Sequence, residues 1–417
     1  MRVVIVGQGY VGLSLAMRCV DAGYVVNGFD TDTEKIKNLK RGISPIDDVV
    51  DSEVVAAIST GRYIPTTHDK DQTGFEVAVI TVPTPLLDSA PDTSFIESAA
   101  KSLAKNLGGN TLVVLESTSY PGTTEDLVAP ILEAGSGLIC GKDFSLAFSP
   151  ERIDPGNTSW NLKSTPKLVS GVDEQSVLRA KAFYEPLVDH LIIASGIREA
   201  ELAKLLENTF RQVNIALVNE LAIHAKTLEI DIWEVIRLAA TKPFGFTPFY
   251  PGPGVGGHCL PIDPEYLSWK ILKDSGEGSK FVNLATSINK KMPAYIVNRV
   301  KAGLASRGIE LRGSSVFVVG VSYKKNSSDM RESPAIETIS LLMEGGAVVK
   351  ALDPKVKFVE SLKFDVVGEL DLGDIKKADI VLVLTNHDDV DYETIVKNSA
   401  YVFDVRHCVF GTNVEYL

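Results

Sequence analysis

The stretch from Arg198 to Thr227 contains neither glycine nor proline, and its leucine, alanine, valine and isoleucine residues recur at helical spacing. Because glycine and proline weaken or break a helix, their absence together with this spacing predicts one long helix. At 1.5 Å per residue, such a helix would extend for about 45 Å. This length exceeds what a small domain needs, so we expect the helix to join two domains.

Short apolar runs alternate with helical patterns on both sides of this helix. The run Val3–Val6 is followed by a glycine turn, a helix and a second run that ends at Asp30. Near Ser314 the alternation begins again, with Val316–Val319 and Gly320. Such alternation is typical of doubly wound parallel sheets. The further strands that it predicts are 77–82, 112–115, 144–148, 348–352, 380–384 and 401–405.

The sequence therefore predicts an α/β protein with two Rossmann-like doubly wound domains, joined by the long central helix and a helical domain. A chain of 417 residues suggests two or three domains, at about 150 residues each. We expect the first Rossmann domain over residues 1–197, the central helical domain over 198–305, and the second Rossmann-like domain over 306–417.

Gly7, Gly9 and Gly12 form a G-x-G-x-x-G motif between the first predicted strand and its helix. The first glycine permits a tight turn, the second lets a pyrophosphate approach the backbone, and the third allows close packing of helix on strand. Asp30 would accept hydrogen bonds from the adenine ribose. Because Asp30 and Asp32 would repel a 2′-phosphate, the expected cofactor is NAD, not NADP. The alternative is a Rossmann unit without a ligand, which better suits the C-terminal half, since that half lacks the full glycine triplet.

Two polar segments each follow a predicted strand of the first sheet. They are Val82-Pro83-Thr84-Pro85 and Ser117-Thr118. Ligands of such folds bind at the carboxyl ends of the strands, so we expect both segments near a ligand. Hydroxyl groups that only cap turns explain Thr84 and Thr118 equally well at this point.

A loop rich in glycine and proline, from Phe249 to Pro264, contains a single cysteine. Four glycines and two prolines stand in the eight residues before Cys259, so the segment cannot continue a helix or a central strand. Such a loop can approach a ligand closely, and Asp263 follows four residues after the thiol. A thiol beside a carboxylate suits covalent chemistry at a carbonyl carbon. The alternative is a buried packing cysteine, which normally lies in an apolar periodic run.

The long predicted helix carries a polar face. Lys204, Asn208 and Arg211 have the spacing i, i+4 and i+7 and share one side of the helix. The apolar residues around them, such as Leu202, Leu206 and Phe210, predict that the helix is largely buried. A partly desolvated lysine and an amide can stabilise a developing alkoxide or oxyanion, and hydroxyl oxidation needs such groups. The alternative is a stripe exposed to solvent.

Composition excludes several classes of function. A formal net charge of −12 argues against nucleic-acid binding. Four cysteines stand far apart, so we expect neither a metal site nor a disulfide framework, and a reducing cytoplasm fits. No run of eighteen apolar residues occurs, so we expect no membrane span. The cysteines are Cys19, Cys140, Cys259 and Cys408.

Taken together, these residues resemble the nucleotide-sugar 6-dehydrogenases, whose substrates include UDP-glucose, UDP-N-acetylglucosamine, UDP-N-acetylmannosamine and GDP-mannose. The resemblance covers essentially the full length, and the motifs occur in the order of the family. The motifs are Gly7–Leu13, Val82–Pro85, Glu116–Thr118, Ser149–Arg152, Lys204 with Asn208, Gly256–Asp263, Gly320–Lys324 and Asp329–Ser333.

The resemblance implies an NAD domain, a central helical domain and a C-terminal domain that binds the nucleotide of the substrate. It implies that the C6 alcohol of the sugar is oxidised twice, with two NAD, to a carboxylate. Cys259 would form a thiohemiacetal with the C6 aldehyde, and the thioester made from it would be hydrolysed. It also implies a homodimer or larger homo-oligomer that uses the long helix, and a product for polysaccharide biosynthesis.

The resemblance also assigns roles to individual residues. Lys204 and Asn208 would stabilise the oxyanion, Asp263 would assist proton transfer, and Glu151 and Thr118 would position water and the nicotinamide side. The residues implied to bind NAD are Gly7, Gly9, Tyr10, Val11, Gly12, Asp30, Lys35, Pro83, Thr84, Ser117, Thr118 and Arg331. The residues implied to contact the UDP-sugar are Glu151, Arg152, Ile153, Lys204, Asn208, Arg211, Phe249, Tyr250, Gly252, Gly256, Tyr323 and Lys324.

Among the sugars, the loop most resembles the UDP-N-acetylglucosamine branch. The glucose branch more often has Tyr or Ser at the place of His258. The N-acetylmannosamine branch usually has His and Arg where this chain has Pro243 and Gly245. UDP-glucose and UDP-N-acetylmannosamine dehydrogenases are therefore the alternatives. More remote alternatives are a single-step dehydrogenase of the 3-hydroxyacid or 6-phosphogluconate type and a non-catalytic regulator that binds NAD, neither of which needs Cys259.

Overall fold

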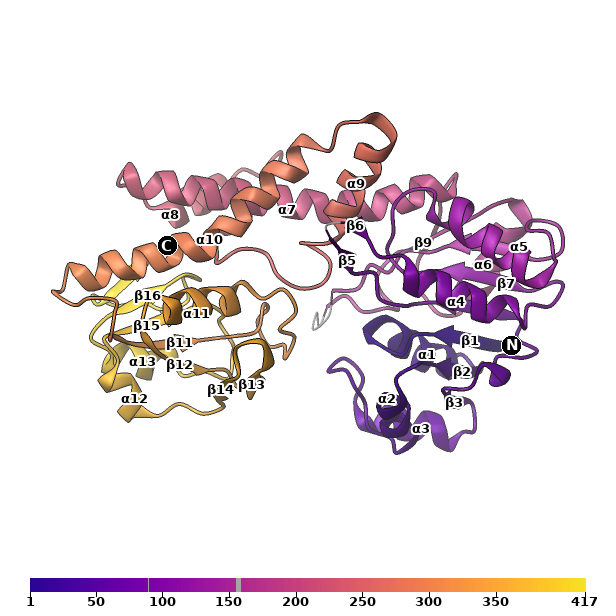
Figure 1. Ribbon diagram of the computed structural model, residues 1–417, viewed down its shortest axis with the longest axis horizontal. Coiled ribbons are helices and arrows are strands. Elements are labelled where there is room, and N and C mark those ends of the chain that lie inside the picture. The colour runs from indigo at the N-terminus through magenta and orange to yellow at the C-terminus, as the bar shows by residue number, and fades with distance from the viewer. Residues whose placement is uncertain (89, 155–158) are drawn as a thin grey trace. The chain divides into compact units, whose positions relative to one another are not determined.

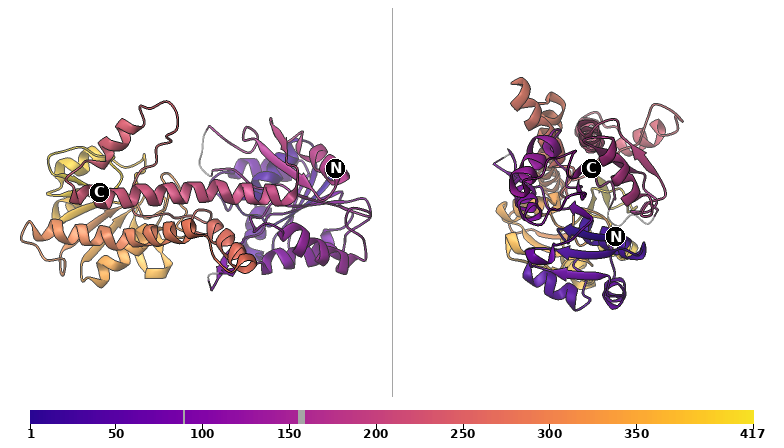
Figure 2. Two further views of the ribbon diagram at one scale, coloured as in Figure 1. Left: turned by 90° about the horizontal axis from the view of Figure 1, so that it is seen from above. Right: turned by 90° about the vertical axis from the view of Figure 1, so that its right-hand side faces the viewer.

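The structure is a computed structural model that describes residues 1–88, 90–154 and 159–417 (Figure 1). These residues form two compact units, one of residues 1–207 with 265–278 and one of residues 208–264 with 279–417. Helix α7 (Ile197–Thr227), unbroken in Figure 2, is the long helix that the sequence predicts. The α/β class is confirmed, and the division into three domains stays a prediction. Within the described ranges, no helix is long and apolar enough to cross a membrane.

The first unit contains an eight-stranded sheet with the order β10-β9-β8-β7-β4-β1-β2-β3. Neighbouring strands are parallel, except that β9 runs antiparallel to β8. The carboxyl ends of the central parallel strands therefore meet at one edge, where ligands of such folds bind. The strands are β1 (Arg2–Val6), β2 (Val25–Phe29), β3 (Tyr63–Thr66), β4 (Val77–Ile80), β7 (Leu112–Leu115), β8 (Ser145–Phe148), β9 (Lys167–Gly171) and β10 (Leu191–Ile193); β5 (Leu86–Leu87) and β6 (Ala90–Pro91) form a separate antiparallel pair.

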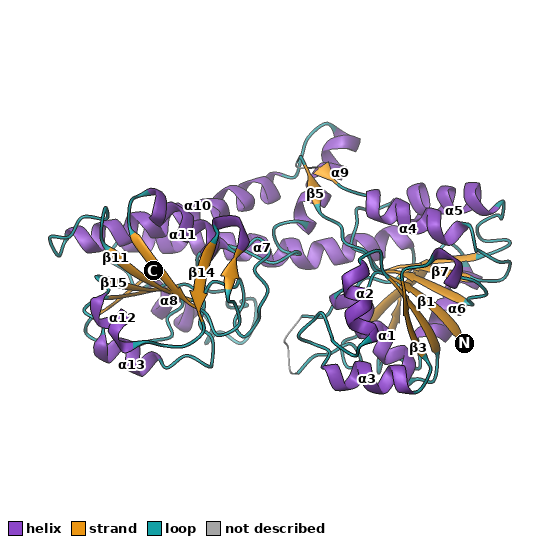
Figure 3. Cartoon of the chain, turned by 60° about the horizontal axis from the view of Figure 1, so that its bottom comes forward, coloured by secondary structure: helices purple, strands orange, loops and turns teal. Residues whose placement is uncertain are grey.

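Helices cover both faces of this sheet (Figure 3). On β1, Val3 and Ile5 belong to the core formed with α1, α2, α3 and α6, whereas Val4 and Val6 belong to the core formed with α4 and α5. Burial on both faces is the reason that the strands read as continuous apolar runs in the sequence. The helices are α1 (Tyr10–Asp21), α2 (Thr33–Lys40), α3 (Asp51–Ser59), α4 (Ser94–Ala104), α5 (Ala129–Ser136) and α6 (Glu174–Tyr184), with short turns η1 (Asp69–Asp71) and η2 (Thr123–Val128).

A buried carboxylate fixes the start of α7 in the first unit. Glu201 accepts hydrogen bonds from the backbone N–H groups of Gly122 (2.6 Å) and Thr124 (3.0 Å) and from the Thr124 hydroxyl (2.8 Å). Gly122 directly precedes η2, so Glu201 satisfies N–H groups that a helix start leaves without partners. Burial raises the pKa of Glu201 to about 7, although the three hydrogen bonds act in the opposite direction.

The second unit contains a seven-stranded sheet with the order β13-β14-β12-β11-β15-β16-β17. Neighbours are parallel, except that β13 and β14 are antiparallel. The order of β12, β11 and β15 repeats that of β2, β1 and β4 in the first unit, as the restarted alternation predicts. The strands are β11 (Ser315–Val319), β12 (Val348–Leu352), β13 (Phe358–Val359), β14 (Phe364–Val367), β15 (Ile380–Val383), β16 (Val402–Asp404) and β17 (Val414–Tyr416).

The second sheet is also covered on both faces. Val316 and Val318 of β11 belong to the core formed with α10 and α11, and Phe317 and Val319 to the core formed with α12 and α13. Helix α8 adds a smaller cluster with the end of α7. The remaining helices are α8 (Ile232–Ala239), α9 (Asp263–Ser275), α10 (Lys280–Ala305), α11 (Pro334–Glu344), α12 (Leu372–Lys377) and α13 (Tyr392–Asn398), with a short turn η3 (Glu360–Leu362).

A carboxylate near the C-terminus connects the helices of the second unit to its sheet. Glu415 of β17 accepts hydrogen bonds from Arg299 of α10 (2.6 Å), Lys226 of α7 (3.1 Å) and the Tyr401 hydroxyl (2.7 Å). Burial alone would raise the pKa of Glu415, but these three donors outweigh it and lower the pKa to about 2. The charged form of Glu415 therefore stabilises the packing of α7 and α10 on the sheet.

Candidate active site

The glycine motif of the first unit leaves a helix start open to an anion. Gly7 has a φ of +97°, and a Cβ on Gly12 would lie 1.9 Å from the Gly7 oxygen, so neither position accepts a side chain. A Cβ on Gly9, in contrast, would meet no atom within 4 Å. Gly9 is the N-cap of α1 and has no side chain, so no N-cap side chain stands between the start of α1 and a phosphate. These features fit the pyrophosphate of a dinucleotide.

Asp30 follows β2 at the same edge of the sheet. Its carboxylate accepts hydrogen bonds from the backbone N–H groups of Gln8 (2.8 Å) and Asp32 (2.9 Å), and Lys35 of α2 donates to it at 2.7 Å. These contacts orient the carboxylate beside the glycine turn, where an adenine ribose would lie. The structure thus brings together Asp30 and Lys35, two residues that the family resemblance assigns to the cofactor.

The two polar segments after β4 and β7 are held against each other. The Ser117 hydroxyl donates to the Val82 carbonyl oxygen at 2.9 Å, and the Ser117 N–H donates to the Ile80 carbonyl oxygen. Thr84 is buried and Thr118 is partly exposed. Ser117 therefore has a structural contact of its own, whereas Thr118 keeps an exposed part at the ligand-binding edge.

Glu151 lies just beyond the end of β8. One carboxylate oxygen accepts hydrogen bonds from the N–H groups of Arg152 (2.7 Å) and Ile153 (2.6 Å), and the other lies 3.3 Å from the Lys167 ammonium. Arg152 forms an ion pair with Glu207 of α7 at 2.7 Å. Sequence reasoning did not identify Lys167. The available signal was a single lysine at the start of an otherwise apolar strand.

In the second unit, the glycines of the cysteine loop allow close packing on the segment after β11. Gly254 and Gly257 have φ values of +130° and +81°. A Cβ on Gly256 would lie 2.6 Å from the Cβ of Tyr323, and one on Gly257 would lie 2.7 Å from the Tyr323 ring. The Gly257 N–H donates to the Arg331 carbonyl oxygen at 2.9 Å. Part of the glycine content is therefore explained by packing within the protein.

Cys259 stands at the end of this loop and is exposed. Its carbonyl oxygen accepts a hydrogen bond at 2.8 Å from the N–H of Asp263, which is the first residue of α9. The Asp263 carboxylate accepts a hydrogen bond from the Asn208 amide at 2.5 Å, and both side chains are buried. The thiol therefore stands on a turn whose last residue is bound directly to α7.

The three polar residues that share one side of α7 differ in their burial. Lys204 and Asn208 are buried, whereas Arg211 is exposed. The expectation of a largely buried helix holds for Leu205, which is 0% exposed. It is wrong for Leu206 and Phe210, which are 61% and 51% exposed, and for Leu202, which is also exposed. Part of the apolar surface of α7 is therefore exposed.

Other loop residues implied to contact substrate also pack on helices. The Tyr250 ring stacks on Trp233 of α8 with 6.1 Å between ring centroids, and Phe249 meets Phe210 edge to face at 5.6 Å.

Burial and the nearby Arg331 lower the pKa of His258. His258 therefore favours its neutral form.

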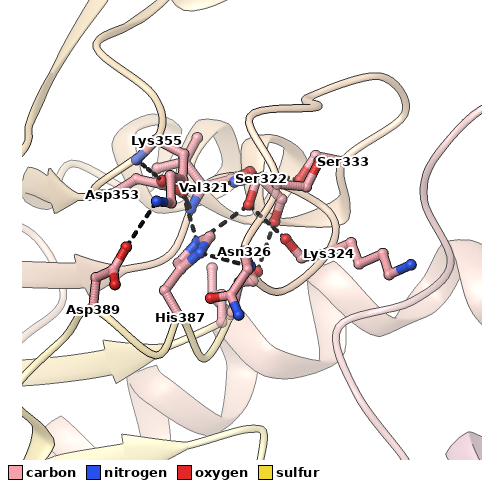
Figure 4. Close-up of polar contacts among 12 residues, drawn as sticks. Val321, Ser322, Lys324, Asn326, Ser333, Asp353, Lys355, His387 and Asp389 are labelled. Atoms are coloured by element: carbon pink, nitrogen blue, oxygen red, sulfur yellow. Dashed lines mark hydrogen bonds and ion pairs between the residues drawn. The ribbon is translucent and has the colours of Figure 1, made fainter. Parts of the chain in front are cut away.

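The turn after β11 differs from the glycine motif of the first unit. The Asp353 carboxylate accepts hydrogen bonds from the N–H groups of Val321 (2.8 Å) and Ser322 (3.0 Å) and lies 3.1 Å from the His387 ring (Figure 4). The other ring nitrogen of His387 accepts from the Asn326 N–H at 3.0 Å, so the proton of a neutral ring faces Asp353. Asp353 follows β12 as Asp30 follows β2, but it is fully buried and holds the turn itself.

Two substrate candidates flank this buried network, Tyr323 and Lys324. The Lys324 side chain extends away from it in Figure 4, and both residues are partly exposed. An open cavity of about 640 Å³ adjoins the cysteine loop on the side of α10 and α11. Its lining includes Val255, Pro261 and Gln212, and the buried Gln212 side-chain oxygen accepts no hydrogen bond within the described chain.

The predicted catalytic residues are distributed over both units. Thr118, Glu151 and Lys204 belong to the first unit, and Cys259, Asn208 and Asp263 belong to the second. Among them, the structure places Asn208 against Asp263. The roles assigned to these residues, and those of the other substrate and cofactor residues, stay predictions.

Comparisons with known proteins identify the family of the chain. Models of the UDP-glucose/GDP-mannose dehydrogenase family match three consecutive segments: the NAD binding domain at residues 1–188, the central domain at 198–291 and the UDP binding domain at 317–411. The fold and the site thus define a dehydrogenase with separate domains for NAD and for UDP.

Individual relatives match along most of the chain. A UDP-N-acetyl-D-mannosamine dehydrogenase of Pyrococcus horikoshii is 34% identical over 100% of this chain and 98% of its own length. A UDP-N-acetyl-D-glucosamine 6-dehydrogenase of Pseudomonas aeruginosa is 35% identical over 87% of this chain and 85% of its own. The solved structure of the Pyrococcus horikoshii UDP-D-ManNAc dehydrogenase superposes with a TM-score of 0.91 at 32% identity, covering 100% and 98% of the two chains.

The chain belongs to the UDP-glucose/GDP-mannose dehydrogenase family. It is an oxidoreductase, an NAD-dependent UDP-sugar dehydrogenase. The family, the cofactor and the class of substrate that the sequence predicts are therefore confirmed.

Proposed function

We propose that this enzyme oxidises the C6 hydroxyl of a UDP-N-acetylhexosamine to the uronate through a covalent intermediate on Cys259, and that the sugar is N-acetylglucosamine. The observation that carries the proposal is the local order around the thiol. Cys259 ends a glycine loop, and its carbonyl oxygen accepts a hydrogen bond from the N–H of Asp263, the first residue of α9. The Asp263 side chain is in turn hydrogen-bonded to Asn208. A thiol on the same turn as a carboxylate that is hydrogen-bonded to an amide suits acyl chemistry.

The reaction divides into two oxidations and one hydrolysis. Bound NAD supplies the acceptor for the hydride that leaves C6 in each oxidation. After the first oxidation, the thiol adds to the C6 aldehyde, so an S–C bond forms and the aldehyde oxygen takes the proton. Oxidation of this thiohemiacetal gives a thioester, and water then adds to C6 while the C–S bond breaks and the thiolate leaves. In sum, one alcohol, two NAD⁺ and one water give one carboxylate, two NADH and three protons.

Within this scheme the chain contributes charge and orientation. The Asn208 amide donates to the oxygen that becomes negative at C6, and Lys204, one helical turn before it, balances the charge. Asp263 receives a proton in the thioester stages, and Glu151 orients the water that attacks the thioester. Both carboxylates are already oriented by hydrogen bonds, Asp263 by Asn208 and Glu151 by two backbone N–H groups.

The choice of sugar follows from the cysteine loop. Its form around His258 favours N-acetylglucosamine, and a relative of that name is 35% identical. N-acetylmannosamine is the second candidate, because the Pyrococcus horikoshii relative named for it matches the whole chain. Initial rates of NADH release with UDP-GlcNAc, UDP-ManNAc, UDP-GalNAc, UDP-glucose and GDP-mannose separate these substrates. A kcat/KM for UDP-ManNAc tenfold above that for UDP-GlcNAc would reverse our choice.

The covalent step is tested by replacing the thiol. We expect Cys259→Ala to abolish uronate formation while the affinity for NAD is kept, and Cys259→Ser to stop at an intermediate oxidation state. Cys140→Ala, which removes a partly exposed cysteine of the first unit, is the matched control and should keep full activity. A Cys259→Ala variant with full activity, or a yield of one NADH per sugar in the unaltered enzyme, would refute the mechanism.

We also propose that the enzyme is a cytoplasmic homodimer or larger homo-oligomer that associates through the outer side of α7 and α8. Phe210, Leu217, Leu228 and Leu238 are between 50% and 66% exposed. An apolar surface of this kind is typical of an interface. Sedimentation equilibrium should give a dimer or larger assembly, and Leu217→Glu should shift it toward a monomer. A monomer at micromolar concentration would contradict the proposal.

A further inference from the structure

Four polar side chains meet in the interior of the first unit, behind the ligand-binding edge of the sheet. Glu116 follows β7, and Glu151 follows β8 at the same edge. Lys167 is the first residue of β9. The last residues of β9 pair antiparallel with the last residues of β8, so the beginning of β9 extends past the end of β8 toward Glu151. Tyr184 is the last residue of α6. Segments that are distant in the sequence thus place one cation between two carboxylates.

Lys167 is almost fully enclosed in this cluster. Its ammonium lies 3.0 Å from the Glu116 carboxylate, 3.3 Å from the Glu151 carboxylate and 5.3 Å from the centre of the Tyr184 ring. The Tyr184 hydroxyl donates a hydrogen bond to Glu116. The side chains of Lys167 and Glu116 are 5% and 0% exposed, whereas that of Glu151 is 12% exposed. Glu151 is therefore the carboxylate of the cluster that reaches the surface.

The charges of the cluster do not require both carboxylates. Burial lowers the pKa of Lys167, but attraction to Glu116 and Glu151 outweighs this effect and leaves the pKa raised. One buried carboxylate would neutralise one buried ammonium, and Glu116 already has this position. The additional contact to Glu151 adds a side-chain donor to a carboxylate that also accepts hydrogen bonds from the backbone N–H groups of Arg152 and Ile153.

We propose that Lys167 is a positioning residue, which holds Glu151 so that its second carboxylate oxygen faces the water that hydrolyses the Cys259 thioester. The first oxygen of Glu151 accepts two backbone hydrogen bonds. The second accepts one from Lys167, which leaves it a lone pair for water. This inference rests on the proposed function and assigns one of its steps, in which water adds to C6, the C–S bond breaks and the thiolate of Cys259 leaves.

The experiment isolates hydrolysis from the two oxidations. The enzyme is mixed with saturating NAD and the UDP-N-acetylhexosamine that gives the highest rate, quenched in acid, and weighed intact to measure the fraction that carries the sugar on Cys259. Glu151→Gln is the reference that should accumulate this adduct. We expect Lys167→Met to accumulate it as well, with hydrolysis slowed about a hundredfold and with KM and the Kd for NAD unchanged. The readout is the mass of the intact protein, which is separate from the rate of NADH release.

Two further variants separate positioning from stability. Lys167→Arg keeps the charge and should fold even if Lys167→Met does not. Because the guanidinium places its donors differently, we expect hydrolysis to be slowed about tenfold. Lys163→Met, which removes a lysine that is 56% exposed, is the control and should hydrolyse the thioester at the unaltered rate.

The possible outcomes distinguish a failure of the role of Lys167 from a failure of the proposed function. If Glu151→Gln accumulates the adduct but neither variant of Lys167 slows hydrolysis, the inference is wrong and the proposed function stands. If the Lys167 variants lose NAD affinity and hydrolysis in parallel, Lys167 is structural and the inference is overturned. If no variant ever carries the adduct and Cys259→Ala remains active, both the proposed function and the inference fail.

Discussion

The contact between the cysteine loop and Tyr323 leads to a quantitative prediction for Gly257→Ala. The φ of +81° at Gly257 costs a residue with a Cβ about 1–2 kcal/mol. The new methyl group would lie 2.7 Å from the Tyr323 ring, and overpacking of this kind costs about 1–3 kcal/mol more. We therefore expect Gly257→Ala to destabilise the second unit by about 2–5 kcal/mol.

A glycine elsewhere in the same unit serves as a matched control. Gly308 has a φ of +76°, and a Cβ built on it would meet no atom within 4 Å. Gly308→Ala should therefore cost only the backbone part, about 1–2 kcal/mol. The difference between the two variants isolates the clash with the Tyr323 ring, and a double variant with Tyr323→Ala should remove that difference.

Hydrogen exchange measured by mass spectrometry is the assay, because it reports each unit separately. Peptides from β11 and β15 report on the second unit, and peptides from β1 and β4 are the internal reference. Each 1.4 kcal/mol should lower the protection of the slowest amides tenfold. Since the loop leads directly to Cys259, kcat for NADH release should also fall about a hundredfold. Equal losses of protection in Gly257→Ala and Gly308→Ala would refute the reasoning.

Three further predictions use the same logic. Gly9→Ala should leave the stability of the first unit unchanged but weaken NAD binding, whereas Gly12→Ala should destabilise the unit itself; equal stability of the two variants by urea unfolding would contradict this. The pKa of Glu415 lies below its ordinary value of 4.5, so its stabilisation is present above that value and is lost as the pH falls through about 2. Glu415→Gln should therefore lower stability at pH 7 and progressively less at lower pH. The pKa of Glu201 is raised, so its contribution to stability is fully present below pH 4.5 and is lost as the pH rises through about 7. Glu201→Gln should therefore flatten the fall in stability between pH 5 and 8. An unchanged slope of stability against pH would count against the buried carboxylate.

Local patterns in the sequence predicted the central strands of both sheets, the long helix and the class of fold. The apolar runs and the glycine motif can each be recognised within a few residues, because backbone conformation and side-chain alternation are local properties. The segment Arg198 to Thr227 forms α7 for the same reason. The family motifs then supplied the cofactor and the class of substrate, both of which the comparisons confirm.

The sequence did not predict the features that depend on contacts between distant segments of the chain. Lys167 approaches Glu151 only because β9 runs antiparallel to β8, and nothing in the local sequence fixes that direction. The exposure of Leu206 and Phe210 was also missed, because an apolar residue on a helix predicts burial without saying whether its own chain supplies the partner.

The cysteine loop combines both kinds of information. Its glycines predict a backbone that can approach another surface, and the sequence reading took that surface to be the sugar nucleotide. The structure shows that the backbone at Gly256 and Gly257 approaches Tyr323, a side chain of the nucleotide-binding domain itself. Part of the glycine content of this loop is therefore required by packing within the protein, because any side chain at Gly256 or Gly257 would meet Tyr323.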